Sequence, residues 1–334
     1  MSLYEKILGK NATVGVIGIG YVGLPLAVEK ARAGFKVVGF DIQQKRVDMV
    51  NRGENYIGDV DDDELKELVN SGKLRATTNF DELANCDVVS ICVPTPLDQF
   101  KQPDLSYIVN SANEVKKRLR KNQLIVLEST TYPGTTEEVV LPILEETGLK
   151  VGKDFYLAFS PERVDPGNPR YKTRNTPKVV GGVTPDCTKH AVALYESVLE
   201  AGVFPVSSPR AAEMTKILEN TFRLVNIALV QEMTKVAEKM GVNIWEVIEA
   251  ASTKPFGYMP FYPGPGIGGH CIPIDPFYLV YKAKEYDEHM MLVEVAGEIS
   301  DDMPYYVVDR LSDILNDRRE CLNGANILLL GVTY

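Results

Sequence analysis

The sequence lacks long hydrophobic runs, an excess of positive charge and a regular cysteine spacing. No apolar stretch reaches the about 18 residues that a membrane-spanning helix needs, and Met1–Lys6 contains no hydrophobic signal core. The formal net charge of -10 argues against a general nucleic-acid surface or an anionic-membrane surface. We therefore expect a soluble, cytoplasmic protein whose ligands are small molecules.

Cysteine and histidine are too few and too scattered to build a disulfide framework or a metal site. The five cysteines are odd in number and widely spaced, which fits a reducing compartment. The three histidines are spread along the chain, and no ligand pair has a standard spacing. We expect no bound metal. The remaining composition, 45% apolar and 25% charged over 334 residues, is that of a globular protein of roughly two or three domains.

A glycine-rich turn near the N-terminus connects an apolar strand to a helix. The predicted strand covers 13–18, the turn 18–23 and the helix 24–33, and a second strand over 36–40 ends at Asp41. This order is that of a complete βαβ unit with a dinucleotide fingerprint. A structural turn without a ligand is the alternative.

Each part of this fingerprint has a role in holding a dinucleotide. Gly18 allows the turn, Gly20 lets backbone approach a pyrophosphate at the helix N-terminus, and Gly23 allows close helix packing. Asp41 would accept a hydrogen bond from a ribose 2′-OH, which favours NAD over NADP.

Further apolar segments recur at the spacing of an α/β protein. Strands are predicted over 87–93, 124–128, 156–159 and 179–181, and helices such as 105–120 and 136–147 lie between them. This pattern predicts a Rossmann-like, doubly wound parallel sheet.

Two of these strands end in unusual turns, over 93–96 and 129–135. Ligands of open α/β sheets lie beyond the carboxyl ends of the strands, so prolines and hydroxyls there predict the nicotinamide side of a cleft. Helix capping by the hydroxyls is the alternative. The candidate cofactor-binding residues are Gly18, Gly20, Tyr21, Val22, Gly23, Asp41, Arg46, Val93, Pro94, Thr95 and Thr130.

A loop over 160–169 concentrates charge without helical spacing. Glu162 could act on the proton of a water or an alcohol, and Arg163 could bind a phosphate or a carboxylate. The alternative is a solvated loop with a local ion pair.

A long helix is predicted from Pro209 to Met240. Its broad apolar stripe predicts packing over much of its surface, and a helix of this kind between domains is also a plausible dimer interface. Lys216 could shuttle a proton, and with Asn220, one turn away, it could donate hydrogen bonds to an oxyanion. The alternative is a lysine that only extends its ammonium group to solvent.

The loop 264–276 has four glycines in six residues and then a single thiol, Cys271. Glycines at this density suit backbone that takes positive φ or lies close to a ligand. A surface turn with an incidental cysteine is the alternative. A thiol becomes useful in oxidation at the aldehyde level, because its adduct is a second hydride donor and leaves a thioester that water cleaves.

Together these motifs resemble the UDP-glucose/GDP-mannose dehydrogenase family, over essentially the whole chain. The segments that carry the resemblance are 18–25, 93–96, 129–135, 160–163, 213–216 with Asn220, and 268–276. The resemblance implies NAD-dependent, four-electron oxidation of the C6 alcohol of a nucleotide sugar, with two NAD consumed.

The same resemblance implies a role for each candidate catalytic residue. Cys271 would be the nucleophile, and Lys216 and Asn220 would hold the C6 oxygen. Asp275 would assist proton transfer, while Thr130 and Glu162 would position water for thioester hydrolysis. The candidate substrate-binding residues are Glu162, Arg163, Lys216, Asn220, Tyr262, Gly264, Gly268 and His270.

His270 and Ile274 narrow the expected substrate. UDP-glucose dehydrogenases of the family usually have Ser and Lys at these places, whereas this loop is similar to the branch that acts on UDP-N-acetylhexosamines. The segments 129–138 and 254–258 are most similar to those of enzymes for UDP-N-acetylglucosamine. The N-acetylmannosamine and N-acetylgalactosamine epimers and UDP-glucose remain alternatives. A two-electron β-hydroxyacid dehydrogenase and an NAD-binding module without catalysis are more distant ones.

The expected organisation has three parts. An NAD-binding domain covers 1–207, a helical central domain with the cysteine loop and a homodimer helix covers 208–305, and 306–334 begins a C-terminal UDP-binding domain. The apolar segment 327–332 reads as the first strand of that second α/β domain, so the chain is expected to stop there. We accordingly expect measurable NAD affinity and weak UDP-sugar binding.

Overall fold

The computed structural model describes residues 1–164, 167–168, 170–269 and 271–331. The chain divides into two compact units, Met1–Lys216 and Ile217–Tyr334. We call them unit 1 and unit 2 and describe each by itself. The boundaries expected from the sequence, at 207/208 and 305/306, stay predictions.

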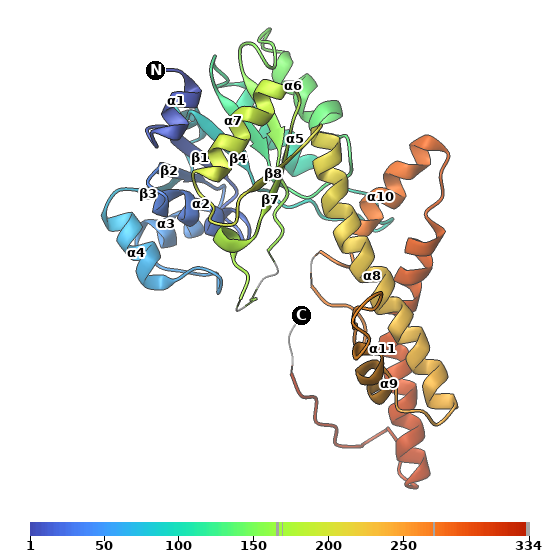
Figure 1. Cartoon of the computed structure of the whole chain (residues 1–334). Coiled ribbons are helices and arrows are strands. Elements are labelled where there is room, and N and C mark those ends of the chain that lie inside the picture. Colours follow the sequence, from blue (N-terminus) through green and yellow to red (C-terminus); the bar gives the residue numbers. More distant parts are fainter. Residues whose placement is uncertain (165–166, 169, 270, 332–334) are drawn as a thin grey trace. The chain divides into compact units, whose positions relative to one another are not determined.

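Unit 1 is built on an eight-stranded sheet in the order β3-β2-β1-β4-β5-β6-β7-β8, with helices on both faces (Figure 1). The chain leaves β1 in one direction for β2 and β3, and in the other for β4, β5 and β6. The reversal beside β1 is the switch point at which Rossmann folds bind dinucleotides. The strands are β1 (Thr13–Ile17), β2 (Lys36–Phe40), β3 (Leu74–Thr77), β4 (Val88–Ile91), β5 (Leu124–Leu127), β6 (Tyr156–Phe159), β7 (Lys178–Gly182) and β8 (Val203–Val206).

The doubly wound, mostly parallel sheet is confirmed, with one antiparallel pairing. β7 pairs antiparallel with β6, and β8 then pairs parallel with β7. A parallel neighbour needs a crossover connection, usually a helix. In the described part of 160–177 the only helical piece is the short turn Thr173–Asn175, so the chain simply reverses.

The helices of unit 1 include several that the sequence analysis missed, namely α1, α3, α4 and α7. The expected helix over 136–147 is divided into a π-helical turn, Thr136–Val140, and a short α-helix. Pro142 explains the break, because it has no N–H to continue the helical hydrogen bonds. The α-helices are α1 (Leu3–Leu8), α2 (Gly23–Arg32), α3 (Gln44–Asn51), α4 (Asp62–Asn70), α5 (Ser106–Lys116), α6 (Leu141–Glu145) and α7 (Pro185–Glu196).

The core of unit 1 lies on both faces of the sheet, because successive strand residues point to opposite sides. Val126 belongs to one buried cluster together with Leu24 of α2, and Ile125 and Leu127 belong to the other together with Ile108 of α5. The strands are therefore apolar at nearly every position, and the carboxyl ends of β1, β4, β5 and β6 stay fixed relative to one another.

Unit 2 is helical. The long helix α8 (Pro209–Lys239) begins in unit 1 and continues through unit 2, as the sequence predicts. It is followed by α9 (Ile244–Ser252), α10 (Asp275–Ala283), a short turn η4 (Lys284–Tyr286) and α11 (Met291–Asp317). The part of the chain that is described contains no helix long and apolar enough to cross a membrane.

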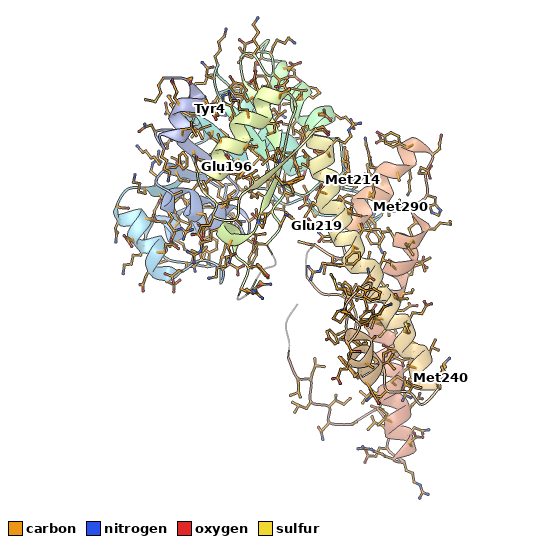
Figure 2. The ribbon with its side chains drawn as sticks, viewed as in Figure 1. Tyr4, Glu196, Met214, Glu219, Met240 and Met290 are labelled. Carbon is orange, nitrogen blue, oxygen red and sulfur yellow. The ribbon has the colours of Figure 1, made fainter. Side chains whose placement is uncertain are left out.

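Two apolar segments of unit 2 are exposed. The apolar stripe of α8 is covered only in part by the described residues: Ile217 and Ala237 are buried, as the sequence predicts, whereas Leu218 is 64% and Met240 70% exposed, and Figure 2 shows Met240 at the C-terminal end of the helix. Residues 327–331 form no strand, and Leu328 is 82% exposed. A strand needs a hydrogen-bonding neighbour, and no described residue supplies one there.

Candidate functional site

The glycine turn after β1 has the backbone that its sequence predicts. Gly18 has a φ of +86°, and a Cβ on it would lie 2.5 Å from the Cys92 carbonyl oxygen. A Cβ on Gly23 would lie 1.8 Å from the Gly18 carbonyl oxygen, whereas Gly20 has open space around it. Gly18 and Gly23 are therefore required by the fold, and Gly20 leaves room for a ligand.

The residues present fit a dinucleotide. Val22 precedes α2, and no described side chain caps the helix there, so its N-terminal end suits an anionic group. Asp41 follows β2 and is 6% exposed. Its carboxylate accepts hydrogen bonds from the N–H of Ile19 (3.2 Å) and of Gln43 (2.9 Å), and Arg46 Nη1 lies 3.5 Å away. Asp41 therefore joins the second strand to the glycine turn.

Tyr56 also supports this turn and was missed by the sequence analysis. Its hydroxyl donates to the Ile19 carbonyl oxygen at 2.5 Å, and burial raises the pKa of Tyr56 above its ordinary value. No sequence pattern pointed to it, because the residue lies in a loop far from the fingerprint.

The turns after β4 and β5 lie together, as expected from neighbouring strands. The Val93 N–H donates to Ser129 Oγ at 2.9 Å, and Thr95 Oγ1 donates to the Thr130 carbonyl oxygen at 2.5 Å. Pro94 lies between the two contacting residues of its turn. Thr130 is partly exposed, as are Val93 and Thr95 of the neighbouring turn, so these side chains remain accessible to a ligand.

Glu213 caps the segment that follows these turns, so the alternative of Ser or Thr capping is not what the structure shows there. The Gly134 N–H donates to one Glu213 oxygen at 2.5 Å, and the Thr136 N–H and hydroxyl donate to the other at 2.9 and 2.6 Å. Burial raises the pKa of Glu213, and these donors oppose that effect. The sequence contained a clue to this role, an acid on the apolar side of α8, three residues before Lys216.

In the loop after β6, one oxygen of Glu162 is held by backbone. Glu162 Oε1 accepts from the N–H groups of Arg163 (2.9 Å) and Val164 (3.0 Å). The other oxygen, Oε2, lies 3.6 Å from Lys178 Nζ. Arg163 Nη1 donates to the Pro177 carbonyl oxygen at 2.8 Å.

Behind Glu162 lies a group of buried charges that the sequence analysis did not find. Glu128 contacts Lys178 Nζ at 2.8 Å and Lys30 Nζ at 3.3 Å, and both ammonium groups lie over the ring of Tyr195. Burial by itself would raise the pKa of Glu128, but Lys178 and Lys30 lower it to about 2. For Lys178, burial favours the neutral form and Glu128 outweighs it, so the pKa of Lys178 is raised.

In unit 2 the cysteine loop ends directly at a helix. The N–H of Asp275, the first residue of α10, donates to the Cys271 carbonyl oxygen at 2.8 Å, and the Ile274 N–H does so at 3.2 Å. Cys271 is half-buried and in no disulfide. The thiol-bearing residue therefore lies one turn before the N-terminus of α10, an end that favours negative charge.

The helix α8 meets this loop through Asn220. Its side-chain amide donates to Asp275 Oδ2 at 2.5 Å, and both residues are at least 96% buried. The structure thus brings together Asn220, Asp275 and the backbone of Cys271, all in unit 2. Lys216, 7% exposed, lies one turn earlier on α8, at the end of unit 1.

The remaining candidate substrate-binding residues of this loop and the segment before it are Tyr262, Gly264, Gly268 and His270. Tyr262 stacks on Trp245, with ring centroids 6.0 Å apart. Gly266 and Gly269 have positive φ, but Gly264 and Gly268 do not. His270 lies outside the described residues.

Comparison with known proteins identifies the family. The model of the NAD-binding domain of the UDP-glucose/GDP-mannose dehydrogenase family matches residues 12–199, and that of its central domain matches residues 210–302. The chain belongs to this family. It is an NAD-dependent dehydrogenase, which confirms the expected resemblance, the enzyme class and the cofactor.

Three similar proteins illustrate the range within the family. A UDP-N-acetyl-D-glucosamine 6-dehydrogenase of Pseudomonas aeruginosa is 40% identical over 97% of this chain and 76% of its own length. An NDP-N-acetyl-D-galactosaminuronic acid dehydrogenase of Ralstonia nicotianae is 40% identical over 90% of this chain and 71% of its own. A solved UDP-N-acetylmannosamine dehydrogenase structure from Pyrococcus horikoshii is 37% identical, with a TM-score of 0.86 over 92% of this chain and 72% of that one.

Proposed function

We propose that this enzyme oxidises the C6 alcohol of a UDP-N-acetylhexosamine, with UDP-N-acetylglucosamine as the preferred substrate, to the carboxylate. The observation that carries the proposal is the Asn220–Asp275 hydrogen bond next to Cys271, in a chain that also has the NAD fold. The cysteine next to this pair has no role in a two-electron alcohol dehydrogenase, which needs a base and a hydride acceptor but no thiol. The names of the similar proteins support an N-acetylated sugar.

The reaction consumes one alcohol, two NAD and one water, and yields one carboxylate, two NADH and three protons. Bound NAD accepts the hydride in each oxidation. In the first, the C6 hydroxyl loses its proton and C6 loses a hydride, which leaves an aldehyde. Cys271 loses its thiol proton, its sulfur bonds to C6, and the aldehyde oxygen becomes an alkoxide; loss of a second hydride from C6 then leaves a thioester. The oxygen of water bonds to C6, the bond between C6 and sulfur breaks, and the sulfur takes up a proton, which leaves the carboxylate and the free thiol.

The residues have separate roles in this scheme. We assign Lys216 and Asn220 to the C6 oxygen, where their N–H groups stabilise negative charge. Asp275, bonded to Asn220, takes part in proton transfer. Glu162 and Thr130 position the water of the last step.

Substrate recognition is assigned to the residues expected from the sequence. Arg163 suits a phosphate, and the paired rings of Tyr262 and Trp245 offer a flat apolar surface. His270 and Ile274 support an N-acetylated sugar over UDP-glucose. The choice between epimers depends on one hydroxyl's orientation, so a single hydrogen bond can decide it.

We also propose that the enzyme is a cytoplasmic homodimer, with a second copy covering the exposed stripe of α8. In unit 2 this stripe recurs at intervals of 4, 7, 4, 3 and 4 residues, the spacing of a single helix face. An uncovered apolar surface of this length is typical of an interface. Its members are Leu218, Phe222, Leu229, Met233, Val236 and Met240.

The test is a panel of UDP-sugars assayed with NAD, with NADH and product counted in the same reaction. Two NADH per carboxylate, with the highest kcat/KM for UDP-N-acetylglucosamine, support the proposal. One NADH per product would instead support a two-electron dehydrogenase. A preference for another epimer would correct only the substrate.

A further inference from the structure

Four charged side chains of alternating sign form a continuous line inside unit 1, which we call the charge line. Lys30 Nζ lies 3.3 Å from Glu128, Glu128 lies 2.8 Å from Lys178 Nζ, and Lys178 Nζ lies 3.6 Å from Glu162. The side chains of Lys30, Glu128 and Lys178 are at most 2% exposed, and that of Glu162 is 13% exposed. Only the Glu162 end therefore reaches towards solvent.

The charge line is more than the fold by itself requires. A buried ion pair costs desolvation energy, and apolar residues of similar volume often stabilise a core as well or better. Lys30 and Glu128 already neutralise each other. Lys178 adds a second buried cation, which contacts Glu128 and the ring of Tyr195 and, in the loop after β6, the Pro161 carbonyl oxygen (3.2 Å) and Glu162.

Glu162 is held differently at its two oxygens. Oε1 accepts two backbone N–H groups, from Arg163 and Val164. Oε2 is buried and makes no hydrogen bond within the described part of the chain, and Lys178 Nζ is the cation beside it. Backbone N–H groups hold one oxygen, and the Lys178 charge attracts the other. Together these contacts restrict rotation of the Glu162 carboxylate.

We propose that Lys178 is a positioning residue for Glu162, and this rests on the proposed role of Glu162 in holding the water of thioester hydrolysis. Glu128 holds the Lys178 ammonium group in place through the ion pair at 2.8 Å. A carboxylate that orients water has to stay within about 0.5 Å of its working position, and two independent constraints achieve this. Lys178 therefore acts on hydrolysis through Glu162, not on NAD or the nucleotide.

The test is a double-mutant cycle with Lys178→Met, Glu162→Gln and the two combined, measuring kcat and KM for the UDP-sugar. Lys178→Met should lower kcat about 10- to 100-fold and change KM less than about twofold, as expected for lost positioning. In the Glu162→Gln background it should lower kcat no further, because Lys178 acts through that carboxylate. During turnover, mass spectrometry should show the Cys271 thioester accumulating in Lys178→Met.

Lys30→Met is the matched control, since Lys30 bonds Glu128 and Ser90 from the other side of the charge line. It should lower the melting temperature about as much as Lys178→Met and leave kcat within about threefold of wild type. Lys178→Arg keeps the buried charge, and it should recover part of kcat. If Lys178→Met does not fold, Lys178→Arg replaces it in the cycle. Its smaller loss in kcat should then be absent when Glu162→Gln is also present.

If wild type releases two NADH per product, two outcomes would overturn the role of Lys178 without affecting the proposed function. One is that the losses in kcat of the single variants multiply in the double variant. The other is that Lys30→Met lowers kcat as much as Lys178→Met does. A wild type that releases one NADH would overturn the proposed function and, with it, the hydrolytic step that Lys178 serves.

Discussion

At the scale of single residues, the proposed chemistry depends on a few side chains that backbone contacts hold in place. Cys271 is fixed through its carbonyl oxygen, and Asp275 through both its N–H and its carboxylate. Because these contacts belong to the loop and α10, changing the sulfur alone should leave the geometry intact. Activity can then be separated from folding.

Cys271→Ser should abolish acid formation, with a loss of at least about 10³-fold in kcat, because a serine hydroxyl does not form the thioester. The carboxylate product is measured by mass spectrometry. Cys321→Ser, at an exposed cysteine, is the control and should keep full activity. Full acid formation by Cys271→Ser would rule out the thioester route.

Glu213→Gln should destabilise unit 1 by about 1 to 3 kcal/mol, because an amide offers one acceptor oxygen where three donors now converge on two. Its NH2 group would also face a backbone N–H. Urea unfolding followed by circular dichroism measures the change. Glu232→Gln, an exposed acid on the same helix, should change stability by less than about 0.5 kcal/mol. Equal effects of the two variants would contradict the capping role.

At the scale of elements, the helix α8 carries a structural cap, candidate catalytic residues and the exposed stripe. Its first turns carry Glu213 and Lys216, its middle carries Asn220, and the exposed stripe runs along the part in unit 2. A long helix can combine these roles because residues on different faces do not compete for the same neighbours.

Replacing Leu229 and Met233 together by Glu should convert a dimer into a monomer, since two charges in each copy of the stripe would have to be buried. Light scattering after size-exclusion chromatography measures the mass. Lys239→Glu, exposed at the end of α8 and outside the stripe, is the charge-changing control and should remain dimeric. A dimer that persists in the double variant would place the interface elsewhere.

At the scale of the whole molecule, stability depends on the protonation of a histidine that the folded chain buries in its neutral form. His190 of α7 lies against Tyr156 of β6, with ring centroids 3.8 Å apart, and its Nδ1 is 2.7 Å from the Asp186 carbonyl oxygen. Burial lowers the pKa of His190 below its ordinary 6.5. The unfolded chain therefore takes up a proton at a higher pH than the folded chain does.

The free energy of unfolding should accordingly be highest above about pH 6.5 and fall as the pH drops towards the lower pKa of the folded state. Urea unfolding at a series of pH values between 8 and 5 measures this dependence. His190→Phe keeps a ring against Tyr156 and should show a weaker dependence over the same range. An unchanged slope in the variant would mean that other groups cause the loss.

Much of the fold and part of the site could be predicted from the sequence because they depend on local patterns. Gly18 and Gly23 lie where a Cβ would clash with a backbone carbonyl oxygen, so only glycine fits there. The strands near them are continuous apolar runs. The hydrogen bond between Asn220 and Asp275 was not predicted, because the two residues are 55 positions apart and only the fold brings them together.

The sequence by itself determined the NAD-binding turn, the apolar strands and the long helix, because glycine geometry and hydrophobic spacing act over a few neighbouring residues. Only the tertiary structure decided the rest: the reversal at β7, the uncovered stripe of α8, the Glu213 cap and the charge line. These depend on which distant segments meet. An isolated Lys30, Glu128 or Lys178 looks like a surface charge until the fold places it opposite its partner, where low dielectric makes the pairing necessary.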